Sequence, residues 1–153
     1  MPSVTSTQPA TPAFTWTVRV YYEDTDAGGV VFYANYLKFF ERARTEWLRS
    51  AGVSQQTMTQ AHGVMFVVKS TAVDFHAPAR LDNELNLTVS VEKMGRASVQ
   101  FIQQAWRVIK NEHGEQRELL ATGHIKIGCV DTQHFRPSQI PQDVLQQINA
   151  MEE

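Results

Sequence analysis

The segment from Tyr33 to Ala51 carries apolar residues at helical spacing, and it constrains the fold more than any other feature of the sequence. These residues follow the i, i+3, i+4, i+7 pattern of one helix face: Tyr33, Tyr36, Leu37, Phe40, Ala43, Trp47, Leu48 and Ala51. Gly52 provides a natural stop. Because the apolar stripe is wide, a broad surface must cover it, and a curved sheet would serve.

The chain after Gly63 is rich in Val, Ile, Phe and Thr, with short links between the apolar runs. We expect four strands in an antiparallel meander, over residues 64–77, 84–93, 97–111 and 115–131, with turns at 78–83, 94–96 and 111–114. Before the helix, residues 14–20 alternate between apolar and polar, as in a half-buried strand. One long helix against one antiparallel sheet is an α+β domain.

The two ends of the chain differ in composition from the middle. Residues 1–13 are mostly Ser, Thr, Pro and Ala with little to bury, so we predict a flexible tail. The domain is expected over residues 14–140. Residues 141–153 are expected to form a short helix and tail, with Pro141 in the first turn. Between the long helix and the strands, Ser54 predicts the cap of a short helix that ends near Gln60.

Composition excludes several classes of function. Charged residues make up 20% of the chain and the net charge is -2, so nothing indicates a nucleic-acid-binding protein. No apolar run approaches the roughly 20 residues of a membrane helix, so no integral membrane segment is expected. Cys129 is the only cysteine, which favours a reducing compartment, and the first residues lack the features of a secretory signal. We therefore expect a cytoplasmic protein.

The sequence shows no metal pattern and none of several common catalytic motifs. The five histidines are scattered, and no cysteine or acidic cluster completes a zinc pattern, so no metal is expected. Cys129 lies in an apolar strand, where a buried, inert thiol is the simplest interpretation. The chain has no dinucleotide-binding glycine loop, no Walker A sequence and no nucleophile elbow.

The loop EDTDAGG, from Glu23 to Gly29, holds the candidate chemistry. Asp24 and Asp26 lie two residues apart, just before two glycines and the helix. The first N–H groups of a helix are unpaired and carry a partial positive charge, so they can polarise a carbonyl. A neighbouring carboxylate could act as nucleophile or as general base on a water. Asp before a helix is also a common N-cap, and local chemistry alone favours that structural interpretation.

The run RVYYEDTDAGGVVFYANYLKFFERARTEWL, with VDFHAPARLDNEL further on, resembles the hotdog-fold thioesterases. It is most similar to the 4-hydroxybenzoyl-CoA thioesterase superfamily, and within it to the acyl-CoA thioesterases associated with the Tol-Pal genes of Gram-negative bacteria. The resemblance covers roughly residues 14–140 and is densest at the motif D-x-D-x-x-G-x-V-x-[FY]-x-x-Y. It implies a hotdog fold, in which a curved antiparallel sheet wraps around one long central helix. It also implies homodimers joined edge to edge, which pair again into homotetramers as dimers of dimers.

The resemblance assigns roles to five positions. Asp26 falls on the catalytic carboxylate, as nucleophile or general base, and the sequence leaves both open. The backbone N–H of Tyr33 falls on the group that polarises the thioester carbonyl. Gly29 matches the glycine that gives the acyl group room. Arg96 and Ser98 match a turn that contacts the phosphates of CoA, with contacts to CoA coming from both subunits. Coenzyme A is then part of the substrate, and no cofactor is expected.

The expected function is hydrolysis of an acyl-CoA to the free acid and CoA, and acyl carrier protein is an alternative acyl carrier. Asp24 is expected to support the loop. Ala27 stands where many relatives of the aromatic branch have Pro, which favours the acyl-CoA branch. Val31 stands where one hydratase branch has His, which argues against hydration. A non-catalytic module that binds acyl-CoA or acyl carrier protein is the main alternative. Asp26 argues against that module, because a buried carboxylate beside an acyl chain is costly.

Overall fold

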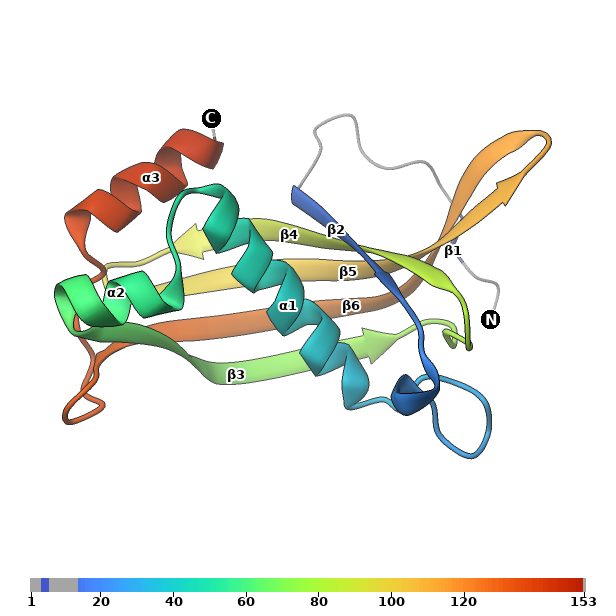
Figure 1. Ribbon diagram of the computed structural model, residues 1–153, viewed down its shortest axis with the longest axis horizontal. Helices are drawn as coiled ribbons and strands as arrows, with labels where there is room; N and C mark the ends of the chain where they lie inside the picture. The colour runs from blue at the N-terminus through green and yellow to red at the C-terminus, as the bar shows by residue number, and fades with distance from the viewer. Residues whose placement is uncertain (1–3, 6–13, 153) are drawn as a thin grey trace.

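The computed structural model describes residues 4–5 and 14–152, which form one antiparallel sheet with a long helix across it (Figure 1). The strands are β1 (Val4–Thr5), β2 (Phe14–Arg19), β3 (Val64–Phe75), β4 (Glu84–Met94), β5 (Ser98–Asn111) and β6 (Gly114–Asp131). Their order is β1-β6-β5-β4-β2, with β3 also paired to β6. The predicted α+β class is confirmed. Of the predicted tail, Val4–Thr5 pair with β6, and the rest lies outside the described residues.

The predicted four-strand meander is wrong at its first strand. β4, β5 and β6 are successive neighbours, but β3 pairs with β6 at the far edge, from Val64 opposite Asp131 to Phe75 opposite Ala121. The segment 78–83 is therefore a crossover from β3, at one edge, to β4, next to the edge strand β2 on the other side, and not a hairpin. Its backbone bonds elsewhere: Ala79 O accepts from the N–H of Val31 at 2.8 Å.

Helix α1 (Asn35–Ser50) lies across β4, β5 and β6 with one face against the sheet (Figure 1). The buried side chains of that face are Asn35, Tyr36, Phe39, Phe40, Ala43, Trp47 and Leu48. Two residues of the predicted stripe do not belong to this buried face. Leu37 is 45% exposed, and Tyr33, which is 66% exposed, precedes the helix. Phe39, which the predicted stripe omitted, is fully buried. The helix is thus rotated slightly from the predicted orientation.

Close contacts hold α1 against the sheet. A Cβ at Gly123 would lie 2.9 Å from the Phe40 ring, so a glycine on β6 lets that ring approach the backbone. Trp47 packs edge-on against Phe101 of β5, with ring centroids 5.2 Å apart. The fully buried amide of Gln103 donates to the carbonyl of Phe40 at 3.1 Å. These contacts fix the height of the helix above the strands.

Two shorter helices close one end of the sheet. Helix α2 (Gln55–His62) begins at Ser54, whose hydroxyl accepts from the Thr57 N–H at 3.1 Å, so the predicted cap is confirmed. Helix α3 (Gln142–Glu152) follows Pro141, whose carbonyl accepts from the N–H of Leu145. Among the residues that the structure describes, no helix is long and apolar enough to cross a membrane.

The rotation of α1 can be tested by comparing two neighbouring apolar residues. Phe39→Ala should lower the free energy of unfolding by about 3–5 kcal/mol, because it empties a fully buried position. Leu37→Ala should change it by no more than about 0.5 kcal/mol, because that side chain is largely exposed. Urea denaturation followed by circular dichroism measures both. Equal losses for the two variants would contradict the orientation of the helix.

Candidate active site

The predicted loop leads from β2 to α1 and is closed by its own backbone. Thr25 and Val31 form an isolated antiparallel bridge. Within it, the Asp26 N–H donates to the carbonyl of Val30 at 2.9 Å, and the Gly29 N–H donates to the carbonyl of Asp26 at 3.0 Å. Gly29 has a φ of +78°, in the left-handed region that favours glycine. The loop is therefore a defined turn with a fixed shape.

Asp24 joins the end of β2 to the start of α1. Its side chain is buried, and its two carboxylate oxygens accept from the Tyr21 N–H and from the Asn35 amide, each at 2.8 Å. Its carbonyl also accepts from the Phe32 N–H at 3.0 Å. These contacts confirm the supporting role expected for Asp24 and set the position of the loop relative to the helix.

Asp26 is exposed in the single chain, so the expectation of a buried carboxylate is wrong for one subunit. Its Oδ1 accepts from the Gly28 N–H at 2.8 Å, an aspartate turn that orients the carboxylate. A Cβ at Gly28 would lie 3.2 Å from that oxygen, so the close approach suits glycine. The sequence analysis assigned Gly28 no role, although Asp-x-Gly is a pattern typical of such a turn.

The backbone N–H of Tyr33 lies in the turn that leads into α1, and not on the helix itself as predicted. The helix begins at Asn35, with Ala34 as its N-cap, because the preceding residues still form a turn in which the Asn35 N–H donates to Phe32. The Tyr33 N–H donates to no acceptor within the described part of the chain. It is therefore free to donate to a ligand.

Tyr33 also lines a hollow of about 300 Å³, which we call the Tyr33 hollow. It is lined by Val31, Tyr33, Tyr36, Phe75, His76, Ala77 and Pro78. Phe75, at the end of β3, packs edge-on against Tyr36 with ring centroids 5.4 Å apart. The Tyr36 oxygen accepts from the Ala79 N–H, and burial raises the pKa of this phenol, which keeps it protonated. The walls are mostly apolar, as an acyl thioester requires.

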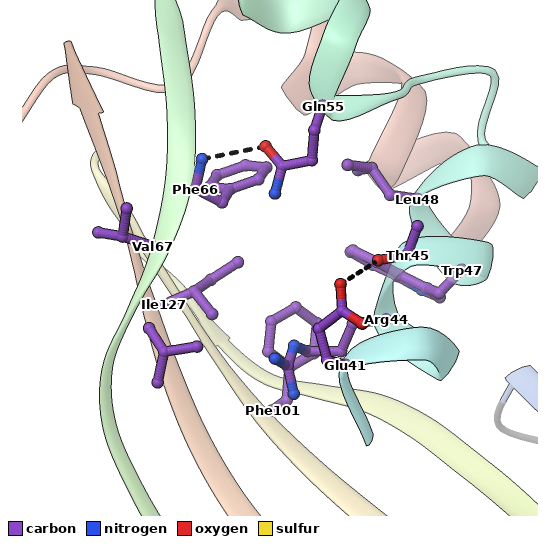
Figure 2. A pocket seen from close by; sticks show the side chains of 11 residues that line it. Glu41, Arg44, Thr45, Trp47, Leu48, Gln55, Phe66, Val67, Phe101 and Ile127 are labelled. Carbon is purple, nitrogen blue, oxygen red and sulfur yellow. Dashed lines mark hydrogen bonds between the residues drawn. The ribbon is translucent and has the colours of Figure 1, made fainter. Parts of the chain in front are cut away.

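A second hollow, of about 150 Å³, lies between the later half of α1, α2 and the first half of β3 (Figure 2). We call it the Glu41 pocket, and it is lined by Glu41, Arg44, Thr45, Trp47, Leu48, Gln55, Phe66, Val67, Val68, Phe101 and Ile127. Phe66 and Val68 line this pocket, whereas Tyr33 and His76 line the Tyr33 hollow.

Polar groups interrupt the apolar wall of the Glu41 pocket. The Thr45 hydroxyl donates to the Glu41 carboxylate at 3.1 Å, and both groups border the open space in Figure 2. Arg44 donates to the side-chain amide oxygen of the buried Gln103 at 2.8 Å. Burial lowers the pKa of the Arg44 guanidinium. The Gln55 side chain accepts from the Phe66 N–H at 3.2 Å. The pocket thus presents both hydrogen-bond donors and acceptors.

Arg96 and Ser98 lie far from Asp26 in the single chain. They flank the β4–β5 turn, where the Gly95 N–H donates to the carbonyl of Ser98 at 2.8 Å. β4 begins at Glu84, opposite Arg19 just before the loop, and its length puts the turn about 33 Å away at the other end of the sheet. One subunit therefore does not bring these predicted site residues together.

Two further chemistries find little support in the structure. Burial raises the pKa of the Cys129 thiol to about 11, so the group stays a thiol near neutral pH, which confirms the inert role. In the described ranges, no group of three or more His, Cys, Asp or Glu side chains could hold a metal ion.

Comparison with known proteins places the chain in a family. Residues 20–148 match the model of the thioesterase-like superfamily. The acyl-CoA thioesterase YbgC of Haemophilus influenzae is 42% identical over 131 residues, which are 86% of this chain and 90% of that protein.

Two solved structures share the fold. The structure of a probable thioesterase from Bartonella henselae has a TM-score of 0.71 and 30% identity, over 83% of this chain and 98% of that one. 4-hydroxybenzoyl CoA thioesterase, solved as a mutant with 4-hydroxybenzoyl CoA, has a TM-score of 0.80 at 17% identity, over 90% and 99% of the two chains. The chain described here therefore belongs to the thioesterase-like superfamily and has its hotdog fold.

Proposed function

We propose that the protein is an acyl-CoA thioesterase in which Asp26 and the backbone N–H of Tyr33 act on the thioester. The observation that carries the proposal is the unpaired N–H of Tyr33, which lies beside an apolar hollow and close in sequence to an oriented, exposed carboxylate. The 42% identity to the acyl-CoA thioesterase of H. influenzae supports the same reaction.

The two groups have complementary roles in this proposal. The Tyr33 N–H donates to the thioester oxygen and stabilises the negative charge that develops there. Asp26 either attacks the carbonyl carbon and displaces the CoA thiolate, leaving an anhydride that a water then hydrolyses, or takes a proton from a water that attacks the carbonyl carbon, which then expels the CoA thiolate. Gly29 leaves space at the loop, since nothing lies within 4 Å of the Cβ that it lacks. Either route ends with a free acid and CoA. The only coenzyme involved is therefore the CoA that forms part of the substrate.

A second subunit is part of the proposal because β3 is an open edge. Among the residues that the structure describes, α2 covers only the start of this edge, where Gln55 accepts from the Phe66 N–H. The His76 N–H donates to β6, at Leu120, so the alternation of an antiparallel pair turns the N–H groups of Thr71 and Val73 away from β6. Val68 and most of the residues from there to Phe75 are exposed. An exposed strand of this length favours pairing with another copy of itself.

Antiparallel pairing of two β3 strands would also complete the site. β3 begins near the β4–β5 turn and ends at Phe75, which lines the Tyr33 hollow. The two-fold axis of such a dimer would therefore bring the start of β3 in one subunit beside the end of β3 in the other. The partner subunit's Arg96 and the partner subunit's Ser98 would then face the loop that carries Asp26, where CoA phosphates need cations.

Other parts of the proposal follow the resemblance. Two dimers would pair into a homotetramer, and an acyl carrier protein would present the same thioester as CoA. The chain is proposed to belong to the Tol-Pal-associated subfamily. A cytoplasmic location is proposed because the only cysteine is a buried thiol.

Asp26→Asn should reduce thiol release from acyl-CoA by about 10²- to 10⁴-fold, because the amide neither attacks nor accepts a proton well. Thiol release is followed with a colorimetric reagent over short, long and aromatic acyl-CoAs, and the thermal midpoint should stay unchanged. Glu23→Gln, an exposed carboxylate in the same loop, is the control and should keep wild-type rates. Full activity of Asp26→Asn would refute the mechanism. Acyl-CoA binding without any turnover by the wild type would favour the binding module.

The two aspartates should differ in what their loss affects. Asp24→Ala should lower the free energy of unfolding by about 2–3 kcal/mol, because it leaves the Tyr21 N–H and the Asn35 amide without their acceptor. Asp26→Ala should lower it by no more than about 0.5 kcal/mol, because its side chain is exposed. Urea titration of both variants decides, and equal losses would show that Asp24 does not anchor the loop.

Thr71→Pro tests the proposed pairing of β3 strands. Proline removes an N–H that faces the open edge while leaving the bonds to β6, so the dimer should dissociate with the fold retained. Light scattering after gel filtration measures the mass, and thiol release should fall with dimer content. Thr71→Ala is the control and should remain dimeric. A Thr71→Pro variant that stays dimeric and active would exclude this edge as the interface.

A further inference from the structure

We propose that the Glu41 pocket binds the far end of the acyl group, that it selects short acyl groups carrying a hydroxyl there, and that it serves the Asp26 and Tyr33 of the partner subunit. The proposal deepens the proposed thioesterase function and rests on it.

The size of the pocket limits what it holds. Its volume is about 150 Å³, and an engineered cavity of about 150 Å³ in another protein holds benzene. Trp47, Leu48, Phe66, Phe101 and Ile127 supply apolar walls. The pocket therefore suits a short chain of methylene groups or one small ring, and it excludes the nucleotide of CoA by both size and chemistry.

The polar groups of the pocket define the end of that chain. Glu41 presents a carboxylate that only accepts, and Thr45, which already donates to Glu41, has lone pairs left to accept with. Arg44 only donates, and the Gln55 amide nitrogen points toward the open space in Figure 2. A hydroxyl both donates and accepts, so it can satisfy the two kinds of group at once. A terminal carboxylate would be repelled by Glu41, and a terminal methyl would gain no hydrogen bond from these groups.

The pocket is too far from the Tyr33 of its own chain to share a short acyl group with it. Glu41 lies six positions after Asn35, the first residue of α1, which is about 9 Å along the helix, and Tyr33 lies further away in the turn before it. The proposed dimer shortens this separation. If the exposed run from Val68 to Phe75 pairs with its copy about Ala72, Thr71 lies opposite the partner subunit's Val73 and Val68 lies near the partner subunit's Phe75, which packs near the partner subunit's Tyr33. The pocket, which Val68 lines, then lies beside the partner's thioester site.

The experiment compares acyl-CoAs of equal length with and without a terminal hydroxyl. The wild type should hydrolyse 6-hydroxyhexanoyl-CoA with a kcat/KM about 10- to 100-fold above that for hexanoyl-CoA, less than the roughly 10⁴-fold of a fully buried hydroxyl site because Glu41 is exposed in the single chain. Glu41→Leu should abolish or reverse this preference, measured as the ratio of the two kcat/KM values. Glu46→Gln, on the same helix but outside the pocket, is the control and should keep the preference.

Mixed dimers decide which subunit supplies the pocket. Subunits with Asp26→Asn and subunits with Glu41→Leu are co-expressed under two affinity tags, and the heterodimers are isolated. If the pocket serves the partner, one site of each heterodimer has both native groups and the hydroxyl preference returns. If the pocket serves its own chain, the only active site has Leu at position 41 and the preference stays absent, which overturns that part of the proposal.

The outcomes separate this proposal from the thioesterase proposal. Hydrolysis of both hexanoyl substrates at equal kcat/KM by the wild type overturns the hydroxyl selectivity and leaves the thioesterase function standing. If neither is hydrolysed, the thioesterase proposal fails, and calorimetric titration with the same two CoA esters tests the pocket. Tighter binding of the hydroxylated ester that is lost in Glu41→Leu supports the selectivity, and equal binding overturns it.

Discussion

The burial of one face of α1 against a single sheet is the interaction on which the rest of the structure depends. Phe39, Phe40 and Ala43 are fully buried there, and Gly123 gives Phe40 the room to meet the strand backbone. The helix packs over β4, β5 and β6. Residues of both α1 and β3 line the Tyr33 hollow, near the end of β3, and the Glu41 pocket, near its start. The same packing that stabilises the domain thus leaves space for a ligand.

The loop before α1 combines a buried anchor with an exposed reactive group. Asp24 is buried and has its acceptors filled by Tyr21 and Asn35, so it fixes the backbone of the loop relative to the helix. Asp26, two residues later, faces solvent and is oriented only by Gly28. Several large aromatic side chains close to it in sequence are also exposed, namely Tyr21, Tyr22, Phe32 and Tyr33. Exposed apolar groups beside a carboxylate typically mark a surface that another molecule covers.

The sequence predicts the elements of this fold better than their arrangement. Periodicity located α1 and β3 to β6, because alternation and helical spacing are local properties. The same pattern predicted that β3 lies beside β4, because local periodicity does not determine which strands pair. In the structure β3 pairs with β6, and Arg80 of the segment 78–83 forms a bridge with Val30 of the loop before α1. Helical spacing also admits two adjacent stripes, which is why Leu37 was preferred to Phe39. For the site, local chemistry left Asp26 as a probable cap, and only the family motif singled it out. Its exposure could not be predicted, because it depends on what the single chain leaves uncovered.

The positions of the candidate site residues favour one kind of assembly over another. Asp26 and Tyr33 lie at one end of the sheet, and Arg96, Ser98 and the Glu41 pocket lie toward the other. Parallel pairing of two β3 strands would bring like ends together and leave the cationic turn remote from both aspartates. Antiparallel pairing about a two-fold axis brings unlike ends together and creates two equal sites at once. The edge that needs a partner for its hydrogen bonds is thus the same edge across which the separated functional groups can meet.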